Sequence, residues 1–390
     1  LDSYILLVDK NHVANLVYIE AKWNEDKQSV VRSEPDDVAS GKHVAFKVTF
    51  SKPIKSTQEA KLTILEEYKN RKRPFPTTMK ITETPKVRVI DDAYYVTIYP
   101  TKKMKSTFEV GPSATVIKAT EIDSGEVRGR SIRYGTYKNV DPLKSHQIVI
   151  YTEYDDPLPI FTSVTRSISL STWGPINIDE EYRLVNRVAD LEGEFGRLDY
   201  NPWKTKYAIH NLDCELPKDT KDLYYTDEIG NITTSNAFRT KKGVSFMIEP
   251  RFPIMGGWKT YWKQGYTLPQ EHYITSGNET DQFVAKFRLS HPYNDIVAED
   301  FTLRIILPEG STDINLDLPF EMEVSRDSTY QYLDLIGSTV LVLTKKNVME
   351  KYHDEFITVK YKLAKFDIFL KPATLVFYAI TALLGTTVFY

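Results

Sequence analysis

Apolar and polar residues alternate over much of the chain, with the period of two that is typical of β-strands with one buried face. The clearest runs are 44–50, 303–307 and 357–363. Further strands are predicted at 94–99, 147–151, 167–171, 177–184, 244–249 and 339–343. Helical periodicity is scarce, with one short turn expected at 348–353. The pattern therefore predicts a mostly β protein.

The stretch 372–390 departs from this pattern because it contains no charged side chain. As a helix rising about 1.5 Å per residue it would reach roughly 28 Å, close to the hydrocarbon thickness of a bilayer. The alternatives are a buried core helix, which usually keeps a polar face, and the removable tail of a lipid-anchor signal. We predict one C-terminal transmembrane helix over 366–390, truncated at its end.

The length of 390 residues exceeds what a single core usually organises, so two domains precede the helix in our prediction. The best boundary is 153–159, where two prolines and three acidic residues interrupt strand-like sequence. We therefore predict β-sandwich-like domains at 1–152 and 153–365, followed by the helix at 366–390.

Charge and cysteine content limit the possible partners and covalent links of the chain. The net charge of −3, from 50 basic and 53 acidic residues, gives no field that would attract nucleic acid, so no nucleic-acid partner is expected. The single cysteine, Cys214, excludes an intrachain disulfide. The chain begins at Leu1 with neither an initiator Met nor an apolar leader, as expected if a signal peptide has been removed or if the first residues are missing from the sequence.

Two N-x-[ST] sequons, at Asn231 and Asn278, are candidate N-glycosylation sites. Each lies beside a turn-forming glycine, and together with a membrane anchor they favour a lumenal or extracellular body. The lysines between 360 and 371 would suggest a cytosolic flank by the positive-inside rule, but long domains are translocated largely regardless of charge.

The sequence offers little catalytic chemistry. The seven histidines form no local zinc motif, and the glycine-rich phosphate loops and the G-x-S-x-G elbow are absent. Acidic pairs stand at 36–37, 91–92 and 155–156; such pairs are usually solvated turns, although two carboxylates could serve a glycosidase. We predict no catalytic, cofactor or metal site in this chain.

Two segments are candidates for interaction. The basic cluster 69–73 could meet headgroups or an acidic partner, or be a solvated loop. In the segment 250–258 two prolines and a glycine pair form a turn that presents Trp258, so Arg251, Gly256, Gly257 and Trp258 are candidate interaction residues. The indole could stack on sugar, pack against another protein, or fill its own domain's core.

Several ordered blocks resemble the ribophorin I family, subunit 1 of the eukaryotic oligosaccharyltransferase complex. They are STWG at 171–174 followed by Glu180 and Glu181, YYTDEIGNITTS at 224–235, RFPIMGGWK at 251–259, IILPEG at 305–310, YLD at 332–334 and KKN at 345–347. Fainter likenesses are PFP at 74–76, YPTK at 99–102 and YG at 134–135. The first 70 residues depart from the animal members.

The resemblance implies a type I, single-pass glycoprotein of the endoplasmic reticulum membrane with two lumenal β-rich domains. It implies a role in transferring a dolichol-linked oligosaccharide en bloc to Asn of N-x-[ST] in nascent proteins. Chemistry would belong to a separate multi-pass catalytic subunit, so this chain would act in assembly, stability and acceptor handling. The implied partners are the other subunits, nascent polypeptide, translocon or ribosome, and membrane lipid. Asn231 matches a family glycosylation position.

Two other functions are open to the same chain. A stand-alone membrane-anchored adhesion or receptor protein would also carry β-domains on one helix. A glycan hydrolase would bring two carboxylates into one cleft, about 5 to 10 Å apart.

Overall fold

The computed structural model describes residues 2–32, 41–55, 59–122 and 125–388. It is mostly strands, at 52% of the chain, with 9% helix, which confirms the predicted fold class. The chain forms two compact units, described separately below. The first comprises Leu1–Leu158, Asn186–Ile209 and Ile254–Trp258, and the second Pro159–Val185, His210–Pro253 and Lys259–Tyr390.

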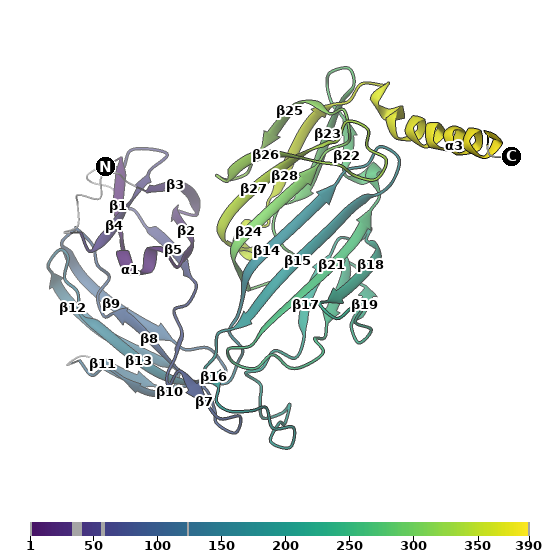
Figure 1. The fold of residues 1–390 in the computed structure, drawn as a ribbon. Coiled ribbons are helices and arrows are strands. Elements are labelled where there is room, and N and C mark those ends of the chain that lie inside the picture. The colour runs from purple at the N-terminus through teal and green to yellow at the C-terminus, as the bar shows by residue number, and fades with distance from the viewer. Residues whose placement is uncertain (1, 33–40, 56–58, 123–124, 389–390) are drawn as a thin grey trace. The chain divides into compact units, whose positions relative to one another are not determined.

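The first unit begins with a five-stranded antiparallel sheet in the order β1-β4-β3-β2-β5 (Figure 1). Its strands are β1 (Ser3–Asp9), β2 (Leu16–Trp23), β3 (Asp26–Arg32), β4 (His43–Thr49) and β5 (Leu62–Tyr68). The helix α1 (Lys10–Val13) follows β1, and Asp9 caps it by accepting from the Asn11 N–H at 2.7 Å. Leu6, Val8, Val44 and Phe46 form a buried cluster on one face, as the alternation at 44–50 predicts.

Three smaller sheets complete the first unit, with the orders β10-β13-β8-β6, β11-β12-β9 and β16-β7. Their strands are β6 (Arg73–Pro74), β7 (Thr78–Met79), β8 (Lys86–Asp92), β9 (Thr101–Glu109), β10 (Ala114–Ala119), β11 (Gly125–Arg128), β12 (Ser131–Val140), β13 (Gln147–Tyr154) and β16 (Asp190–Leu191). Ile132, Tyr134, Ile148 and Ile150 are buried together between β12 and β13. The strand predicted at 147–151 is confirmed within β13.

The strand predicted at 94–99 is wrong, because this segment pairs with no strand and is irregular. Its apolar side chains alternate for a different reason. Tyr94 packs on the Ile132 cluster, whereas Val96 and Ile98 pack on Leu7 and Ala45 of the five-stranded sheet. The segment is therefore a connection with two buried sides, which has the same period as a strand.

The compact units also differ from the single boundary predicted after residue 152. Strand β13 continues to Tyr154, and the first unit extends to Leu158. Two later segments, 186–209 and 254–258, return to the first unit, where they pack around Met79. This return depends on contacts between residues far apart in sequence, which local composition does not reveal.

A seven-stranded mixed sheet forms the centre of the second unit, in the order β18-β21-β15-β14-β24-β27-β26 (Figure 1). Its strands are β14 (Pro159–Ser169), β15 (Ile176–Asn186), β18 (Lys221–Asp227), β21 (Lys259–Leu268), β24 (Val297–Ile306), β26 (Glu323–Thr329) and β27 (Ser338–Met349). Strands β14 and β24 pair in parallel, and the pairs β15–β21, β18–β21, β24–β27 and β26–β27 are antiparallel. The strands predicted at 177–184 and 339–343 are confirmed, and those at 167–171 and 303–307 are confirmed except for their last residues.

Two further sheets accompany it, in the orders β17-β20-β19 and β22-β23-β28-β25. Their strands are β17 (Leu212–Leu216), β19 (Asn236–Arg239), β20 (Val244–Ile248), β22 (Ile274–Ser276), β23 (Gln282–Arg288), β25 (Thr312–Asp317) and β28 (Phe356–Lys362). Two short turns are η1 (Gln270–His272) and η2 (Asp367–Phe369). The turn predicted at 348–353 is present as α2 (Glu350–His353).

Aromatic rings fill the core of the second unit. Phe161, Tyr182 and Trp262 come from the neighbouring strands β14, β15 and β21, and the rings of Tyr182 and Trp262 stack with centroids 5.0 Å apart. All three contact the buried ring of Tyr293. The backbone of Tyr293 pairs with that of Cys214 in β17 as an isolated β-bridge. The core is therefore shared between the large sheet and β17.

An ion pair is buried in this core. The Arg166 guanidinium lies 2.9 Å from Glu180 Oε1, and both side chains are almost inaccessible, at 4% and 0% exposure. Glu180 Oε2 also accepts from the Tyr182 hydroxyl and the Gln264 amide, at 2.9 and 2.8 Å. Such pairing offsets the large cost of removing both charges from water.

The helix α3 (Leu370–Val388) ends the described chain. With the preceding turn it is the one helix in the described part of the chain that is long and apolar enough to cross a membrane, and only 6% of it is buried. The predicted span 366–390 matches it, except that 389 and 390 lie outside the described residues. The Thr381 hydroxyl donates to the Phe377 carbonyl at 2.8 Å, so this polar group has its hydrogen-bond partner within the helix, as a membrane-spanning helix requires.

Candidate functional site

Four features are candidate sites: the turn at Trp258, the turn at Asn231, the base of α3, and a polar cleft in the first unit. Each is assembled from residues far apart in sequence. Their geometry decides which sequence-predicted residues come together.

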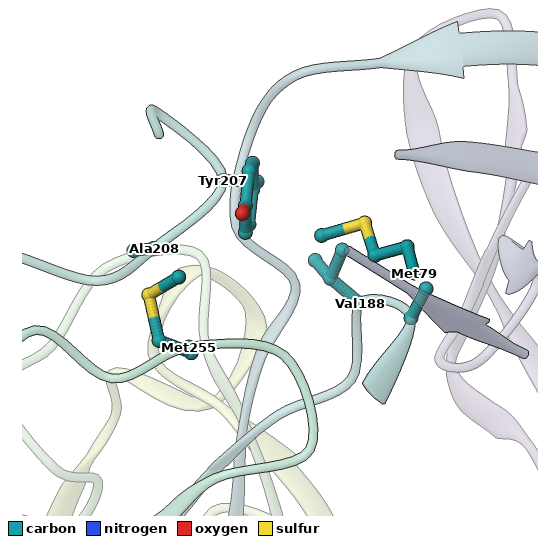
Figure 2. Packing of buried hydrophobic residues seen from close by; sticks show 6 residues of the cluster. Met79, Val188, Tyr207, Ala208 and Met255 are labelled. Carbon is teal, nitrogen blue, oxygen red and sulfur yellow. The ribbon is translucent and has the colours of Figure 1, made fainter. Parts of the chain in front are cut away.

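The turn carrying Gly256, Gly257 and Trp258 belongs to the first unit, where it packs on a buried cluster. This cluster contains Met79, Val188, Ala189, Tyr207, Ala208 and Met255 (Figure 2). Trp258 is half-buried against it and lies 5.8 Å from the Phe195 ring. The indole therefore packs within its own unit, and its role in interaction stays a prediction.

Both glycines of this turn are required by close approach. A Cβ on Gly256 would lie 1.9 Å from the Ala189 carbonyl oxygen, and Gly257 has a positive φ of 77°. Nearby, the buried Asn186 amide donates to the carbonyls of Tyr207 and Ile254, at 2.8 and 3.0 Å. The Gly-Gly pair thus serves chain packing, a reason that the sequence alone did not supply.

Arg251 lies in the second unit and holds the turn that bears the first sequon. Its guanidinium pairs with the Asp227 carboxylate and donates to the carbonyls of Gly230 and Asn231, at 3.2 and 3.1 Å. This hydrogen-bonded partner lowers the pKa of Asp227. The two family-like blocks at 224–235 and 251–259 therefore meet through this contact.

Both predicted glycosylation residues are exposed on turns of the second unit. Asn231 follows β18, and Asn278 lies between β22 and β23. The hydroxyl residues of the two sequons, Thr233 and Thr280, are exposed as well. The geometry suits glycan attachment at either site, and occupancy stays a prediction.

The base of α3 is held to the second unit by an indole and an ion pair. Trp173 Nε1 donates to the Ile368 carbonyl at 2.6 Å, and the Trp173 ring lies 5.9 Å from that of Phe369. Lys371, in the first turn of α3, lies 3.0 Å from Asp334. Three family-like blocks, at 171–174, 305–310 and 332–334, gather here.

Further contacts position the residues that hold the base of α3. Gln270 donates to the carbonyls of Ser171 and Gly174, the first at 2.8 Å, and so fixes the turn that presents Trp173. Gly310 has a φ of 83°, and a Cβ there would lie 2.8 Å from the Asp367 side chain. The helix therefore leaves the body through a defined junction. Sequence reasoning noticed these blocks but not that they converge.

The polar cleft of the first unit has a volume of about 1160 Å³. Arg71 pairs there with Asp91 and lies 2.7 Å from His12 Nδ1. Glu66 accepts from the Tyr68 hydroxyl at 2.5 Å, and burial raises the pKa of Glu66. Both carboxylates are therefore engaged by neighbouring side chains.

The basic cluster 69–73 is likewise engaged in part. Arg71 pairs as above, and the Lys72 ammonium lies 4.0 Å from the centroid of the Tyr154 ring. Arg73 lies in β6, beside Arg88 of β8. These contacts agree better with a structural role than with an open anion site.

The acidic pairs differ in their surroundings. Asp92 accepts from the N–H of Tyr94 and of His146, at 2.8 and 2.9 Å, and so caps a turn. Burial raises the pKa of Asp155. The pair at 36–37 lies outside the described residues. Within the described ranges no group of three or more His, Cys, Asp or Glu is placed to hold a metal ion.

Sequence comparison adds the family. A family model described as Ribophorin I matches residues 1–390. Subunit 1A of the dolichyl-diphosphooligosaccharide–protein glycosyltransferase of Arabidopsis thaliana is 31% identical over 346 residues, 88% of this chain and 55% of the relative. Subunit 1 from Caenorhabditis elegans is 30% identical over 373 residues, 94% of this chain and 63% of the relative. The chain thus spans somewhat over half the length of these relatives.

Solved structures give weaker likenesses. The M1 zinc metallopeptidase from Deinococcus radiodurans matches with a TM-score of 0.30 and 11% identity, over 52% of this chain and 42% of that chain. A score this low does not establish a common fold.

The family model covers both compact units and α3. The resemblance, which the sequence blocks carry from residue 74 onward, extends by this model to the first 70 residues, where no block is evident. The chain belongs to the ribophorin I family.

Proposed function

We propose that this chain is an accessory subunit of the oligosaccharyltransferase complex, anchored in the endoplasmic reticulum membrane by α3 with both units in the lumen. The observation that carries the proposal is the family match over residues 1–390, with relatives named as subunit 1 of that glycosyltransferase. The complex transfers a dolichol-linked oligosaccharide to Asn of N-x-[ST] in nascent proteins. This chain would need no cofactor of its own.

A lumenal body is supported by the sequons. Asn231 and Asn278 are exposed on the second unit, on the N-terminal side of α3. If α3 spans the membrane once, both acceptors lie on one side of it, and glycosylation requires that side to be the lumen.

A non-catalytic role is supported by the state of the cleft carboxylates. Asp91 is paired with Arg71, and Glu66 accepts from Tyr68. A hydrolase needs one carboxylic acid and one carboxylate facing the substrate, and these partners occupy both groups. The chain would instead contribute surfaces that hold the catalytic subunit, other subunits and the acceptor polypeptide.

The test is to purify the tagged full-length protein from membranes in mild detergent and assay oligosaccharide transfer to an N-x-T peptide. We expect the eluate to contain the multi-pass catalytic subunit and to be active. Activity should survive Glu66→Gln and Asp91→Asn and disappear when the catalytic subunit is inactivated. A solitary, inactive protein would instead favour an adhesion or receptor function. Activity lost only with Glu66→Gln or Asp91→Asn would favour an enzyme.

A further inference from the structure

A short loop of the second unit exposes four large apolar or aromatic side chains. The loop 330–337 joins β26 to β27, and its sequence is YQYLDLIG. The exposed fractions are 72% for Tyr330, 84% for Tyr332, and 62% for both Leu335 and Ile336. Single exposed apolar side chains are normal, but a cluster of them usually marks a surface that binds another molecule.

The only charged residue of this loop is turned inward. The Asp334 side chain is fully buried, where it accepts from the Gln331 N–H and the Ser338 hydroxyl, both at 2.8 Å. Burial by itself would raise the pKa of Asp334, but these hydrogen bonds and the Lys371 ammonium outweigh it and lower the pKa. The outer surface of the loop therefore carries no net charge.

A second buried carboxylate fixes the tip of the loop, at Leu335 and Ile336. Glu309, only 3% exposed, accepts from the N–H groups of Leu335 and Ile336, at 2.6 and 2.5 Å. These bonds satisfy the backbone at the two residues whose side chains point outward. The apolar tip is thus a built feature, since two buried acids hold it in place.

The loop lies at the base of α3. Asp334 pairs with Lys371 in the first turn of that helix, at 3.0 Å. Trp173, 59% exposed, donates its indole N–H to the Ile368 carbonyl just before the helix begins. Phe366 and Phe369, exposed at 77% and 56%, flank the same junction. Aromatic side chains therefore surround the point where the chain would enter the bilayer.

We propose that Trp173, Tyr330, Tyr332, Leu335 and Ile336 form an interfacial rim that lies in the boundary between lipid headgroups and acyl chains, beside α3. Tyr and Trp suit this zone because each has an apolar body and a polar tip. Lys371 can extend along the interface while paired with Asp334. The occupant is lipid rather than another protein because the rim adjoins the predicted span directly.

The proposal rests on the anchoring of α3, and it goes further. It makes the second unit sit against the membrane rather than hang on a free stalk, since the loop and the helix are joined by the same ion pair. Anchoring by α3 alone would let the second unit stand away from the membrane. The rim contacts, in contrast, require the second unit to lie against the lipid.

The test is photo-crosslinking in microsomes that contain the full-length protein in its complex. A benzophenone amino acid replaces Leu335 in one variant and Tyr332 in a second, so that a folding failure at one position does not decide the result. The matched control carries it at Ile229, which is 80% exposed on the turn after β18. The membranes are labelled with a clickable fatty acid, which reports lipid adducts.

We expect lipid adducts at 335 and 332 to exceed those at 229 several-fold. Protein adducts without lipid adducts at both positions would overturn the proposal in favour of a subunit interface. Yields equal to the control would overturn it in favour of a solvent-exposed loop. Alkaline carbonate extraction of the same membranes separates the two hypotheses, because release of the chain into the supernatant contradicts anchoring by α3 itself.

Discussion

Arg251 binds Asp227 across a gap of 24 residues, with Nη2 donating to Asp227 Oδ1 at 3.1 Å. Asp227 Oδ1 also accepts from the N–H groups of Ile229 and Gly230, at 2.9 and 3.0 Å. The carboxylate therefore organises the turn from within, and the guanidinium holds it to the loop after β20. The sequon at Asn231 sits on the turn so fixed.

Removing this guanidinium should loosen the turn. In Arg251→Ala, we expect faster amide hydrogen exchange at Ile229 and Gly230, because their acceptor loses its fixed position. Arg251→Lys should restore little of the protection, since an ammonium does not reproduce the planar fork. The control is Lys263→Ala, which removes an exposed pair with Glu181. Unchanged exchange in Arg251→Ala would show that the contact is not structural.

The turn at Gly256 should reject any side chain. Gly256→Ala places a Cβ 1.9 Å from the Ala189 carbonyl, so the backbone must move. We expect a loss of about 3 kcal/mol in the free energy of unfolding, as for overpacked cores. Gly111→Ala, where a Cβ meets nothing within 4 Å, is the control and should change little. Thermal unfolding of both variants in detergent tests this, and equal midpoints would contradict it.

Replacing two adjacent glutamates should lower the free energy of unfolding by very different amounts. Glu180→Ala leaves Arg166 buried without its partner, and we expect a loss of about 3–5 kcal/mol. Glu181→Ala breaks a pair with Lys263 whose side chains are about half exposed, so the loss should stay below about 1 kcal/mol. Denaturant unfolding measures both. Similar losses in the two variants would mean that the buried pair is not critical.

Acid should destabilise the protein in part through His291. Burial lowers its pKa from 6.5 to about 3, so between these values the unfolded chain binds a proton that the folded chain does not. Stability is therefore lost as pH falls below 6.5, by about 2 kcal/mol at pH 5.

His291→Phe should remove this share of the pH dependence. Burial also lowers the pKa of His353, to about 4, and the contribution of His353 to the pH dependence should remain in this variant. The control is His272→Gln, at an exposed position. Unfolding midpoints at pH 7 and pH 5 give the answer, and an undiminished difference in His291→Phe contradicts the argument.

The two sequons should each carry a glycan if the body is lumenal. Asn231→Gln and Asn278→Gln should each remove one mobility step on gel electrophoresis, and the double variant should match the enzymatically deglycosylated protein. Asn211→Gln, at an asparagine outside any sequon, is the control. Mobility unaffected in both single variants would contradict a lumenal body.

Local pattern predicted the strands well where each has one buried and one exposed face. The run at 357–363 became β28 because its buried positions pack while its lysines stay outside. The same reasoning failed at 94–99, because a connection packed on two sides also alternates. Periodicity reports burial, and it reports hydrogen-bond pairing only indirectly.

The sequence by itself determined the strand-rich class, the exposed sequons and the apolar C-terminal helix, since each depends on neighbouring residues. It also carried the family blocks. Only the tertiary structure decided that Trp173, Glu309 and Asp334 meet at the base of α3, that Arg166 is buried against Glu180, and that 186–209 and 254–258 return to Met79. Such contacts join residues from 14 to 195 positions apart, and the energy of packing and pairing that selects them exists only once the chain has folded.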